Sequence, residues 1–598
     1  MCGICGIYNF DKRKVERSDL KLMNESMIRR GPDSEGYCIE NNFGMAMRRL
    51  SIIDIDKSNQ PINSQDKNIS VIFNGEIYNF IEIRDELIKD KIEFKTKGDT
   101  EVILKLYEKL GEKFVSKLIG MYSICIFDKN KNKVLIFRDR FGIKPLYYHH
   151  AKDSFYFSSS LFSFKKVLNL NKSKDSFLLY LCFNYFPSNT SAYENINSLL
   201  PGEYIRIENN NLSIQKYEMA DSDNIYKSSN YNQSMLKDIL QDSISINLRS
   251  DVNLGLMMSS GMDSSIIAKE VSKNTKDIKA YTVDFENKNE NESQIARKFA
   301  DQLNIDHETI EIEEFYVSDY LKEISKFMDE PCADTAIIPS YLISKKANED
   351  GVKVLLSGAG GDEIFAGYGR HYLNFFSFFY GILNFLKIRE HKLLKIFPHR
   401  IQNILFKSLD KKFAYIGNSS GQNLGVILDA VNKNFHEKLL DSLERILSNF
   451  VKNDFGFNSK QIVKTDLSLY LPDNILRPFD KVSMINSVEG RVPFLDHRLL
   501  EVIKTFDLDI TKNGSFKNNK KILREIYNDD LPNYILNNNK KGFNAPIEKW
   551  DIKFDKHQTQ EFFEDTLNMK LVSENTDNKN FKSFLYNLNT YKMWAENN

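Results

Sequence analysis

The chain has 598 residues, with 82 Lys and Arg against 82 Asp and Glu, 41% hydrophobic residues and a mean hydropathy of −0.43. This is the composition of an ordinary globular protein, and it excludes a disordered or collagen-like chain. At about 100 to 200 residues per domain, the length predicts two to four domains. The balanced charge argues against a chain that is basic throughout, so no nucleic-acid partner is expected.

Cysteine usage and the N-terminal sequence predict a cytoplasmic protein. Six Cys residues are too few for a disulfide scaffold, and the start Met-Cys-Gly-Ile lacks the features of a secretion signal. The most apolar stretch, 372–386, is interrupted by Asn and Ser and is shorter than the roughly 20 apolar residues that a span needs. It predicts a buried helix and no membrane span, with a helix on a membrane surface as the alternative.

The first 160 residues are typical of a hairpin-rich antiparallel sheet. Short apolar or alternating runs at 70–73, 121–127 and 134–137 are separated by turn residues, and each predicts a strand. Helices are expected at 81–90 and 100–110. This hairpin-rich pattern is limited to the N-terminal part of the chain, and a different pattern follows from about residue 250.

From about residue 250, strands and helices alternate. Apolar runs at 254–258, 280–285 and 352–356 predict buried strands. The spacing of Ile295, Phe299 and Leu303 predicts an amphipathic helix between two of them. Such an alternation predicts a doubly wound parallel sheet, so the chain is expected to be a multi-domain α/β protein.

A polar segment rich in Asn and Ser separates the two patterns and is the best candidate for a linker. We therefore expect domains at 2–207 and 234–598, joined by a linker at 208–233. Residues from about 370 to 460 have a helical pattern but carry no recognisable motif.

Cys2 is a candidate nucleophile. If the initiator Met is removed, one residue supplies both a thiol and a free α-amine. An α-amine has a pKa of about 7.7 to 8.0, so it can act as a general base toward its own thiol, as in N-terminal-nucleophile hydrolases. Cys2 and Cys5 also form a C-x-x-C, but no second such pair and no His pair except His149 and His150 accompanies it, which disfavours metal or redox chemistry.

A set of motifs follows Cys2 in order. They are RGPD at 30–33, RRLSI at 48–52, QP at 60–61, FNGEIYN at 73–79, DTE at 99–101 and RDRFGIKPLY at 138–147. Over residues 2 to 200 this combination resembles the class II glutamine amidotransferase domain. The resemblance implies an αββα sandwich of the N-terminal-nucleophile hydrolase type, with glutamine as nitrogen donor. Met47 stands where asparagine synthetases often carry His.

The residue types fit attack by a thiolate on the side-chain amide of glutamine. That attack builds an oxyanion, and Asn74 together with the Gly75 N–H can stabilise it. The alternative interpretation is structural, because Asn-Gly is a common hairpin turn. The two interpretations are compatible.

Three further residues are candidates for binding the backbone groups of glutamine. Arg49 offers a fork for the α-carboxylate, while Glu76 and Asp99 can accept from the α-ammonium. Asp99 has a structural alternative as the N-cap of the helix that starts at Thr100.

The segment SSGMDSS at 259–265 follows a predicted strand and precedes a helical run. Such a turn presents backbone N–H groups and hydroxyls to phosphate. It differs from the G-x-x-x-x-G-K-[ST] loop, so kinase-type phosphoryl transfer is not implied. It resembles the pyrophosphate loop of ATP pyrophosphatases, usually S-G-G-x-D-S, with Ser260 in place of the first Gly.

A second turn, SGAGGDEIFAGY at 357–368, also follows a predicted strand. Asp263 and Asp362 are the natural pair to hold Mg²⁺, which prefers oxygen ligands. Five later motifs match the asparagine synthetase domain, so this resemblance covers about 235 to 550. They are YLPDNIL at 470–476, DKVSM at 480–484, EGRVPFLDH at 489–497, KKILR at 520–524 and KGF at 541–543.

The second resemblance implies an ATP site. Its residues are Met258, Ser259, Ser260, Gly261, Asp263, Ser264, Ser265, Val283, Ser357 and Gly358. Lys520 resembles the lysine that stabilises negative charge during adenylate formation and ammonia attack, although a solvated helix Lys beside Lys521 is the alternative.

Together the two resemblances imply a glutamine-dependent amidotransferase of the asparagine synthetase family that uses ATP and Mg²⁺. Ammonia released at Cys2 would pass through an internal channel to displace AMP from an acyl-adenylate, and a homodimer is expected. Aspartate is the default acceptor. Ala359 replaces a common acidic residue and Pro478 a common Lys, which leaves open another carboxylate such as a uronic acid in surface-polysaccharide synthesis.

Two alternatives from other classes are disfavoured. A catalytically idle paralogue could bind glutamine or ATP and regulate a partner, but Cys2 and both predicted metal-binding Asp residues are intact. A β-lactam synthetase-like cyclase would have no use for the glutaminase residues that this chain retains.

Overall fold

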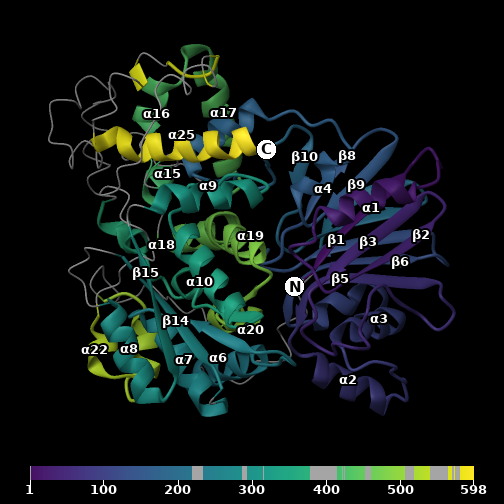
Figure 1. The fold of residues 1–598 in the computed structure, drawn as a ribbon, viewed down its shortest axis with the longest axis horizontal. Helices are drawn as coiled ribbons and strands as arrows, with labels where there is room; N and C mark the ends of the chain where they lie inside the picture. Colours follow the sequence, from purple (N-terminus) through teal and green to yellow (C-terminus); the bar gives the residue numbers. More distant parts are fainter. Residues whose placement is uncertain are drawn as a thin grey trace.

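The computed structural model describes most of the chain in two contacting halves (Figure 1). The described residues are 2–217, 233–275, 277–285, 292–313, 316–376, 414–420, 422, 424–450, 459–505, 518–538, 563, 565–568, 571–572 and 579–598. The first half is rich in strands, and the second is a parallel sheet with many helices. The chain begins between the two halves (Figure 1).

Two six-stranded antiparallel sheets form the first half. The first has the order β10-β8-β9-β1-β3-β2 and the second β12-β11-β7-β6-β5-β4. The strands of the first are β1 (Gly3–Asn9), β2 (Ser34–Glu40), β3 (Phe43–Arg49), β8 (Tyr147–His150), β9 (Ser154–Ser158) and β10 (Ile196–Ser198). Those of the second are β4 (Ile62–Asn63), β5 (Ile69–Ile77), β6 (Gly120–Asp128), β7 (Lys133–Arg138), β11 (Glu203–Glu208) and β12 (Asn211–Lys216).

Alternation along the strands builds the layers. In β1, Ile4 joins a cluster that contains Ile136 and Phe127 of the other sheet, whereas Cys5 packs beneath helix α1 (Arg17–Glu25) with Leu20. Helices α2 (Phe80–Lys89) and α3 (Asp99–Leu110) cover the outer face of the second sheet. The expected αββα sandwich is confirmed.

Two local expectations need correction. The Asn74-Gly75 pair is not a hairpin turn, because it lies inside β5, which pairs with β6 along its whole length. Asp99 is the first residue of α3, and Gly98 holds the cap position. In addition, β12 lies inside the range expected for the linker and pairs with β11, so the first half extends to at least Lys216. Residues 218–232 lie outside the described part.

A five-stranded parallel sheet organises the second half, with the order β15-β14-β13-β16-β17. Its strands are β13 (Leu254–Met257), β14 (Lys279–Phe285), β15 (Asp306–Ile312), β16 (Val354–Leu356) and β17 (Glu489–Arg491). The strand order reverses between β13 and β16, and ligands of such sheets bind at this switch point. The predicted doubly wound sheet is confirmed, while β17 was not foreseen.

Helices surround this sheet (Figure 1). They include α6 (Gln233–Asn247), α7 (Met262–Asn274), α8 (Glu292–Leu303), α9 (Val317–Phe327), α10 (Ile337–Glu349), α19 (Arg477–Ile485), α20 (His497–Thr505) and α21 (Lys521–Ile526). In the 370–460 region, η4 (Gly369–Phe376), α15 (Ala414–Ser419), α16 (Leu424–Ala430), η5 (Lys433–Phe435) and α17 (His436–Ser448) are helical as expected. The remaining helical segments are α4 (Leu161–Lys165), α5 (Lys174–Phe183), η1 (Gly111–Lys117), α11 (Gly361–Ile364), α18 (Ser459–Thr465), η6 (Asp466–Leu476), α22 (Asn533–Leu536) and α25 (Lys579–Asn597).

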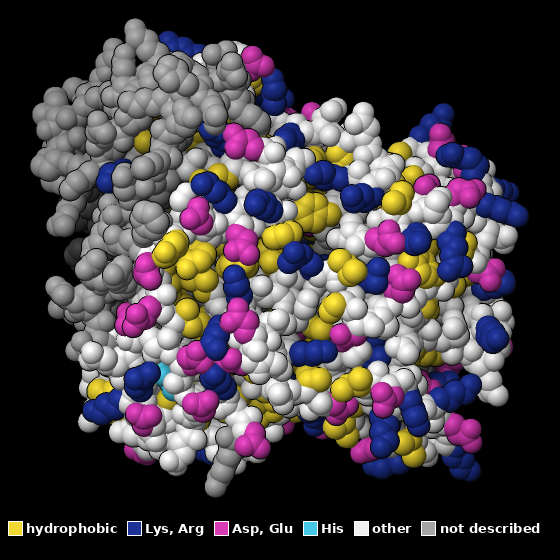
Figure 2. All heavy atoms as spheres, viewed as in Figure 1, with side chains coloured by type: hydrophobic (Ala, Val, Ile, Leu, Met, Phe, Trp, Pro, Cys, Tyr) yellow, Lys and Arg dark blue, Asp and Glu magenta, His cyan; other side chains and the backbone are white. Residues whose placement is uncertain are grey.

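The predicted buried helix at 372–386 lies mostly outside the described residues. Among the helices that the structure does describe, none is long and apolar enough to cross a membrane. On the face shown in Figure 2, acidic and basic side chains are interspersed.

The two halves share a buried interface. Met121 and Phe141 of the first half belong to one apolar cluster with Leu256 and Met258 of the second. Buried ion pairs accompany it, including Arg30 with Asp480 at 2.8 Å between Nη1 and Oδ2. Because a buried charge without its partner is strongly unfavourable, these pairs favour one relative orientation of the two halves.

The sandwich core provides a stability test. Ile136→Ala removes a fully buried side chain between the sheets and should lower the free energy of unfolding by about 2 to 5 kcal/mol. The matched control is Ile214→Ala on edge strand β12, where the side chain is 38% exposed and the cost should be about 0.5 kcal/mol. Urea unfolding followed by far-UV circular dichroism measures the free energy of unfolding of both variants. An equal loss of stability in the two variants would contradict the assignment of Ile136 to the layer between the sheets.

Candidate active sites

Cys2 is held at the interface between the halves. Its backbone N–H donates to Asn74 Oδ1 at 3.0 Å, and its carbonyl accepts from Arg30 Nε at 3.2 Å. Burial raises the pKa of the thiol, while the Leu50 backbone N–H and the Arg49 guanidinium oppose that rise. A thiol with a raised pKa is neutral at rest, so it needs a base when it attacks.

The C-x-x-C alternative fails on geometry. Cys2 belongs to the cluster between the sheets, whereas Cys5 lies on the other face of β1, beneath α1. Both thiols are free. Two side chains on opposite faces of a strand cannot ligate one metal ion or form a disulfide with each other.

Asn74 and Gly75 lie next to Cys2 in the second sheet. The Asn74 carboxamide is fully buried, and its Nδ2 donates to Ser159 Oγ at 3.2 Å. Gly75 has φ +149°, and a Cβ there would lie 1.9 Å from the Met121 carbonyl oxygen. Only glycine therefore lets β5 approach β6 at this position.

The other three predicted glutamine-binding residues have different surroundings. The Arg49 guanidinium donates to the carbonyls of Ile53 and Asp54 at 2.9 and 3.0 Å and also to Ile55. Arg49 thus anchors the loop after β3, and its predicted role toward an α-carboxylate stays a prediction.

Glu76 and Asp99 form a buried acidic pair. Burial raises the pKa of Glu76, Asp99 raises it further, and Arg491 from the second half lowers it. Asp99 Oδ2 accepts from the Ile77 N–H at 3.1 Å, yet burial raises the pKa of this carboxyl to about 6. The pair therefore favours binding of a cationic group that would stabilise the ionised carboxylates.

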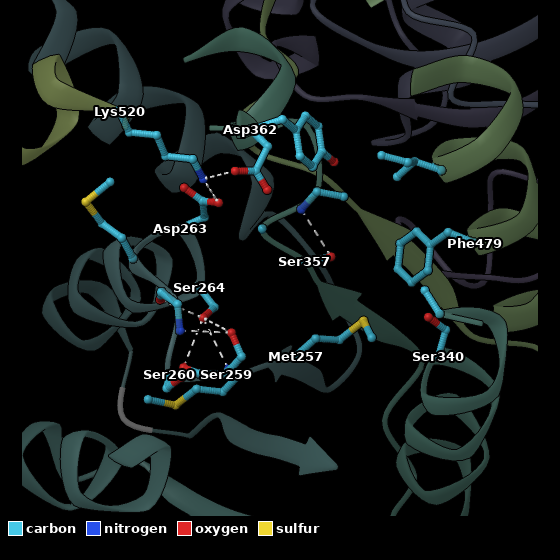
Figure 3. A pocket seen from close by; sticks show the side chains of 18 of the residues that line it. Met257, Ser259, Ser260, Asp263, Ser264, Ser340, Ser357, Asp362, Phe479 and Lys520 are labelled. Atoms are coloured by element: carbon cyan, nitrogen blue, oxygen red, sulfur yellow. Dashed lines mark hydrogen bonds and ion pairs between the residues drawn. The ribbon is translucent and has the colours of Figure 1, made fainter. Parts of the chain in front are cut away.

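A cavity of about 300 Å³ opens at the switch point of the parallel sheet (Figure 3). It brings together nearly all the residues predicted for ATP and metal. They are Met258, Ser259, Ser260, Gly261, Asp263, Ser264, Ser357, Gly358, Asp362 and Lys520. Two predicted residues do not line it: Ser265 is buried in the first turn of α7, where its Oγ donates to the Gly261 carbonyl, and Val283 is buried in β14.

Lys520 and the two predicted metal-binding carboxylates point toward one another (Figure 3). Lys520 Nζ pairs with Asp263 and lies 2.6 Å from Asp362 Oδ1. Burial lowers the pKa of Lys520, but these two carboxylates outweigh burial and raise it, so the ammonium stays charged. Lys521 is instead half-exposed and pairs with Glu525, so Lys520 is the lysine at the cavity.

The cavity has a second wall that the sequence motifs did not identify. Phe479 and Ser340 lie across from the serine loop (Figure 3), and Asp334, Tyr368 and Asn474 also line the cavity. Asn474 Nδ2 donates to Asp334 Oδ2 at 2.6 Å. Residues 470–476 were quoted only as a motif and Phe479 was not singled out, because nothing in the sequence alone showed that these residues face the ATP loop.

Comparisons with known proteins agree with this division. Residues 1–218 match the family described as the glutamine amidotransferase domain, and residues 235–596 match asparagine synthase. The chain is 32% identical to asparagine synthetase (glutamine-hydrolyzing) 1 of Bacillus subtilis over 92% of its own length and 88% of that protein. It is 32% identical to a putative asparagine synthetase 2 of Methanocaldococcus jannaschii, over 83% of this chain and 100% of that one.

A further relative is the amidase chyE of Penicillium rubens, at 25% identity over 87% of this chain and 84% of the relative. Fold and sites thus define a glutamine amidotransferase fused to an ATP-dependent ligase. The chain belongs to the family of glutamine-hydrolysing asparagine synthetases.

The raised pKa of Asp99 predicts a pH dependence. In its predicted role toward the α-ammonium of glutamine, Asp99 acts as an ionised carboxylate. We therefore expect kcat/KM for glutamine hydrolysis to fall as the pH drops through about 6, with the neighbouring Glu76 contributing to the same limb. Asp99→Asn should lower kcat/KM and shift that limb. Ammonium-release assays from pH 5 to 8 measure it, and an unchanged midpoint in Asp99→Asn would exclude Asp99 from the limb.

Proposed function

We propose that the chain hydrolyses glutamine at Cys2 and uses the ammonia to amidate an ATP-activated carboxylate, with aspartate as the default acceptor and asparagine as product. The observation that carries the proposal is the single cavity where the serine loop, Asp263, Asp362 and Lys520 meet. A serine-rich turn at a helix start, two carboxylates and a buried cation together suit a nucleotide triphosphate and its leaving pyrophosphate.

At the first site, the Cys2 thiol would attack the glutamine amide carbon, after transfer of its proton to the α-amine. The tetrahedral oxyanion would be stabilised by Asn74 and the Gly75 N–H, while Arg49, Glu76 and Asp99 bind the glutamine backbone groups. Release of ammonia leaves a thioester, and water hydrolyses it to glutamate. The contacts of Cys2 with Asn74 and Arg30 support this assignment.

At the second site, the acceptor carboxylate would attack the α-phosphorus of ATP and release pyrophosphate. Ammonia would then displace AMP from the acyl-adenylate and form the amide. Lys520 would supply a fixed positive charge beside the phosphates, and the turn residues Ser260, Gly261 and Gly358 line the same cavity.

Asp263 and Asp362 fit a magnesium site. Their oxygens converge on one point, Lys520 Nζ, and a Cβ at Gly361 would lie only 2.7 Å from Asp263 Cγ. Among the described residues no group of three or more His, Cys, Asp or Glu could hold a metal, so phosphate oxygens and water would complete the ligands. Bound Mg²⁺ would neutralise charge on the leaving pyrophosphate.

Transfer of ammonia through the interior is supported by the shared apolar cluster. Met121 and Phe141 pack in it with Met258, and Met258 lines the ATP cavity. An apolar route would keep ammonia unprotonated and away from bulk water.

A different acceptor carboxylate is the second candidate. Among the described residues lining the cavity, the cations are Lys520 and Arg524; Lys520 pairs with two carboxylates, and Arg524 Nε donates to the Asn519 carbonyl. Ala359 and Pro478 line the same cavity without charge. An acceptor that lacks an α-carboxylate, such as a uronic acid, would suit the uncharged surface at Ala359 and Pro478. The relative named an amidase supports a difference in acceptor within the family.

The nucleophile can be tested directly. Cys2→Ala should abolish glutamine-dependent product formation but retain synthesis from ammonium salts, because only the first site uses the thiol. Matched assays with each nitrogen source measure the ratio, and Cys5→Ala serves as a control for loss of a neighbouring thiol. Equal glutaminase rates in the wild type and Cys2→Ala would reject Cys2 as the nucleophile.

The acceptor can be identified by pyrophosphate release from ATP and Mg²⁺ with glutamine and a panel of acids. Release with L-aspartate, with asparagine detected by mass, is the outcome expected for an asparagine synthetase. Release only with a uronic acid or another monocarboxylate would reject aspartate. In that case, Ala359→Glu and Pro478→Lys should restore part of the use of aspartate.

A further inference from the structure

Arg491, at the end of β17, is a fully buried arginine whose side chain reaches the first half. Its Nε donates to Glu489 Oε1 at 2.7 Å, and its Nη1 donates to the carbonyls of Asn247 and Arg249, each at 2.7 Å. Its Nη2 donates to Glu76 Oε2 at 3.0 Å. Three hydrogen bonds to the second half therefore fix the guanidinium, and its Nη2 contacts Glu76, a residue predicted to bind glutamine.

Glu76 has one carboxylate oxygen engaged and one available. Oε2 accepts from Arg491, whereas Oε1 is buried and has no hydrogen-bond partner among the described residues. The side chain as a whole is only 4% exposed. A buried carboxylate oxygen without a donor is costly, and a ligand N–H placed there would remove that cost.

The same residue is attached to the ATP site through its backbone. The Arg491 carbonyl accepts from the Ser357 N–H at 2.8 Å, and Arg491 is aligned with Leu356 in the β16–β17 pairing. The guanidinium thus projects from the sheet edge that also carries the nucleotide loop. Groups held on a rigid strand are positioned more closely than groups on a loop.

We propose that Arg491 is a positioning residue for glutamine, supplied by the synthetase half to the glutaminase half. By holding Oε2 of Glu76, it directs Oε1 toward the α-ammonium of glutamine. This rests on the proposed role of Glu76 and adds that the glutamine site is completed only when the two halves are docked.

The electrostatics support this assignment. Glu76 lies near Asp99 and Glu489, and both raise its pKa in addition to the effect of burial, whereas Arg491 lowers it. Without the guanidinium, the pKa of Glu76 would rise further and favour the neutral acid, which is a weaker partner for an ammonium.

The test is Arg491→Lys, which keeps the charge but cannot span Glu76, Glu489 and two carbonyls at once. In the full-length enzyme we expect KM for glutamine in the glutaminase reaction to rise at least about tenfold, with kcat changed by less than about threefold. Pyrophosphate release supported by ammonium salts should stay within about twofold of the wild type.

The matched control is Glu82→Gln. It removes another Arg–Glu pair across the same interface, Arg249 Nη1 to Glu82 Oε2 at 2.7 Å, without touching a glutamine ligand. It should leave KM for glutamine unchanged. A comparable rise in this control would show that any loosening of the interface weakens glutamine binding and would overturn the specific role of Arg491.

An unchanged KM for glutamine in folded Arg491→Lys would also overturn the proposal. If that variant does not fold, Glu489→Gln replaces it: the arginine is retained but loses its acidic anchor, so KM should rise about threefold, and no rise overturns the proposal. The proposed function fails separately, when the wild type shows no glutaminase activity or Cys2→Ala retains it.

Discussion

The parallel pairing of three short strands is the constraint on which both sites depend. Leu256 of β13, Leu356 of β16 and Arg491 of β17 form one row across the sheet. Because parallel strands end at the same edge, the turns that follow β13 and β16 open into one cavity. The same row ends at Arg491, whose side chain leaves the sheet and enters the glutaminase half.

Buried charge links the two halves more specifically than apolar contact could. Apolar packing of Met121 against the second half tolerates small shifts of the two halves. Arg491 pairs with Glu76 and Glu489 at once, and this is possible only in a narrow range of relative positions. Leaving either carboxylate without its partner would expose an uncompensated charge to a dry interface. This buried arginine therefore sets both the relative orientation of the halves and the position and charge of Glu76, which is a predicted glutamine-binding carboxylate.

Particular residues show which features of the sites could be predicted from local sequence patterns. The serine loop and the two Asp residues were found from local pattern, because strand, turn and helix follow one another in the chain. Asn74-Gly75 was equally local but ambiguous: the pair resembles a turn, and only pairing of β5 with β6 shows that Gly75 serves close strand contact. The contacts of Arg49 could not be foreseen, because the carbonyls that accept from its guanidinium belong to an irregular loop after β3; its role toward glutamine stays a prediction.

By itself, the sequence determined the class of each half, through its ordered motifs, and predicted the residues of each candidate site, since motifs, periodicity and local turns are written in consecutive residues. Only the tertiary structure decided that Lys520 rather than Lys521 meets Asp263 and Asp362, and that Cys2 and Cys5 pack into different apolar clusters. It alone revealed the wall around Asp334 and the reach of Arg491 to Glu76. These are contacts between residues far apart in the chain, set by strand order and by packing of the halves, and no local pattern encodes them.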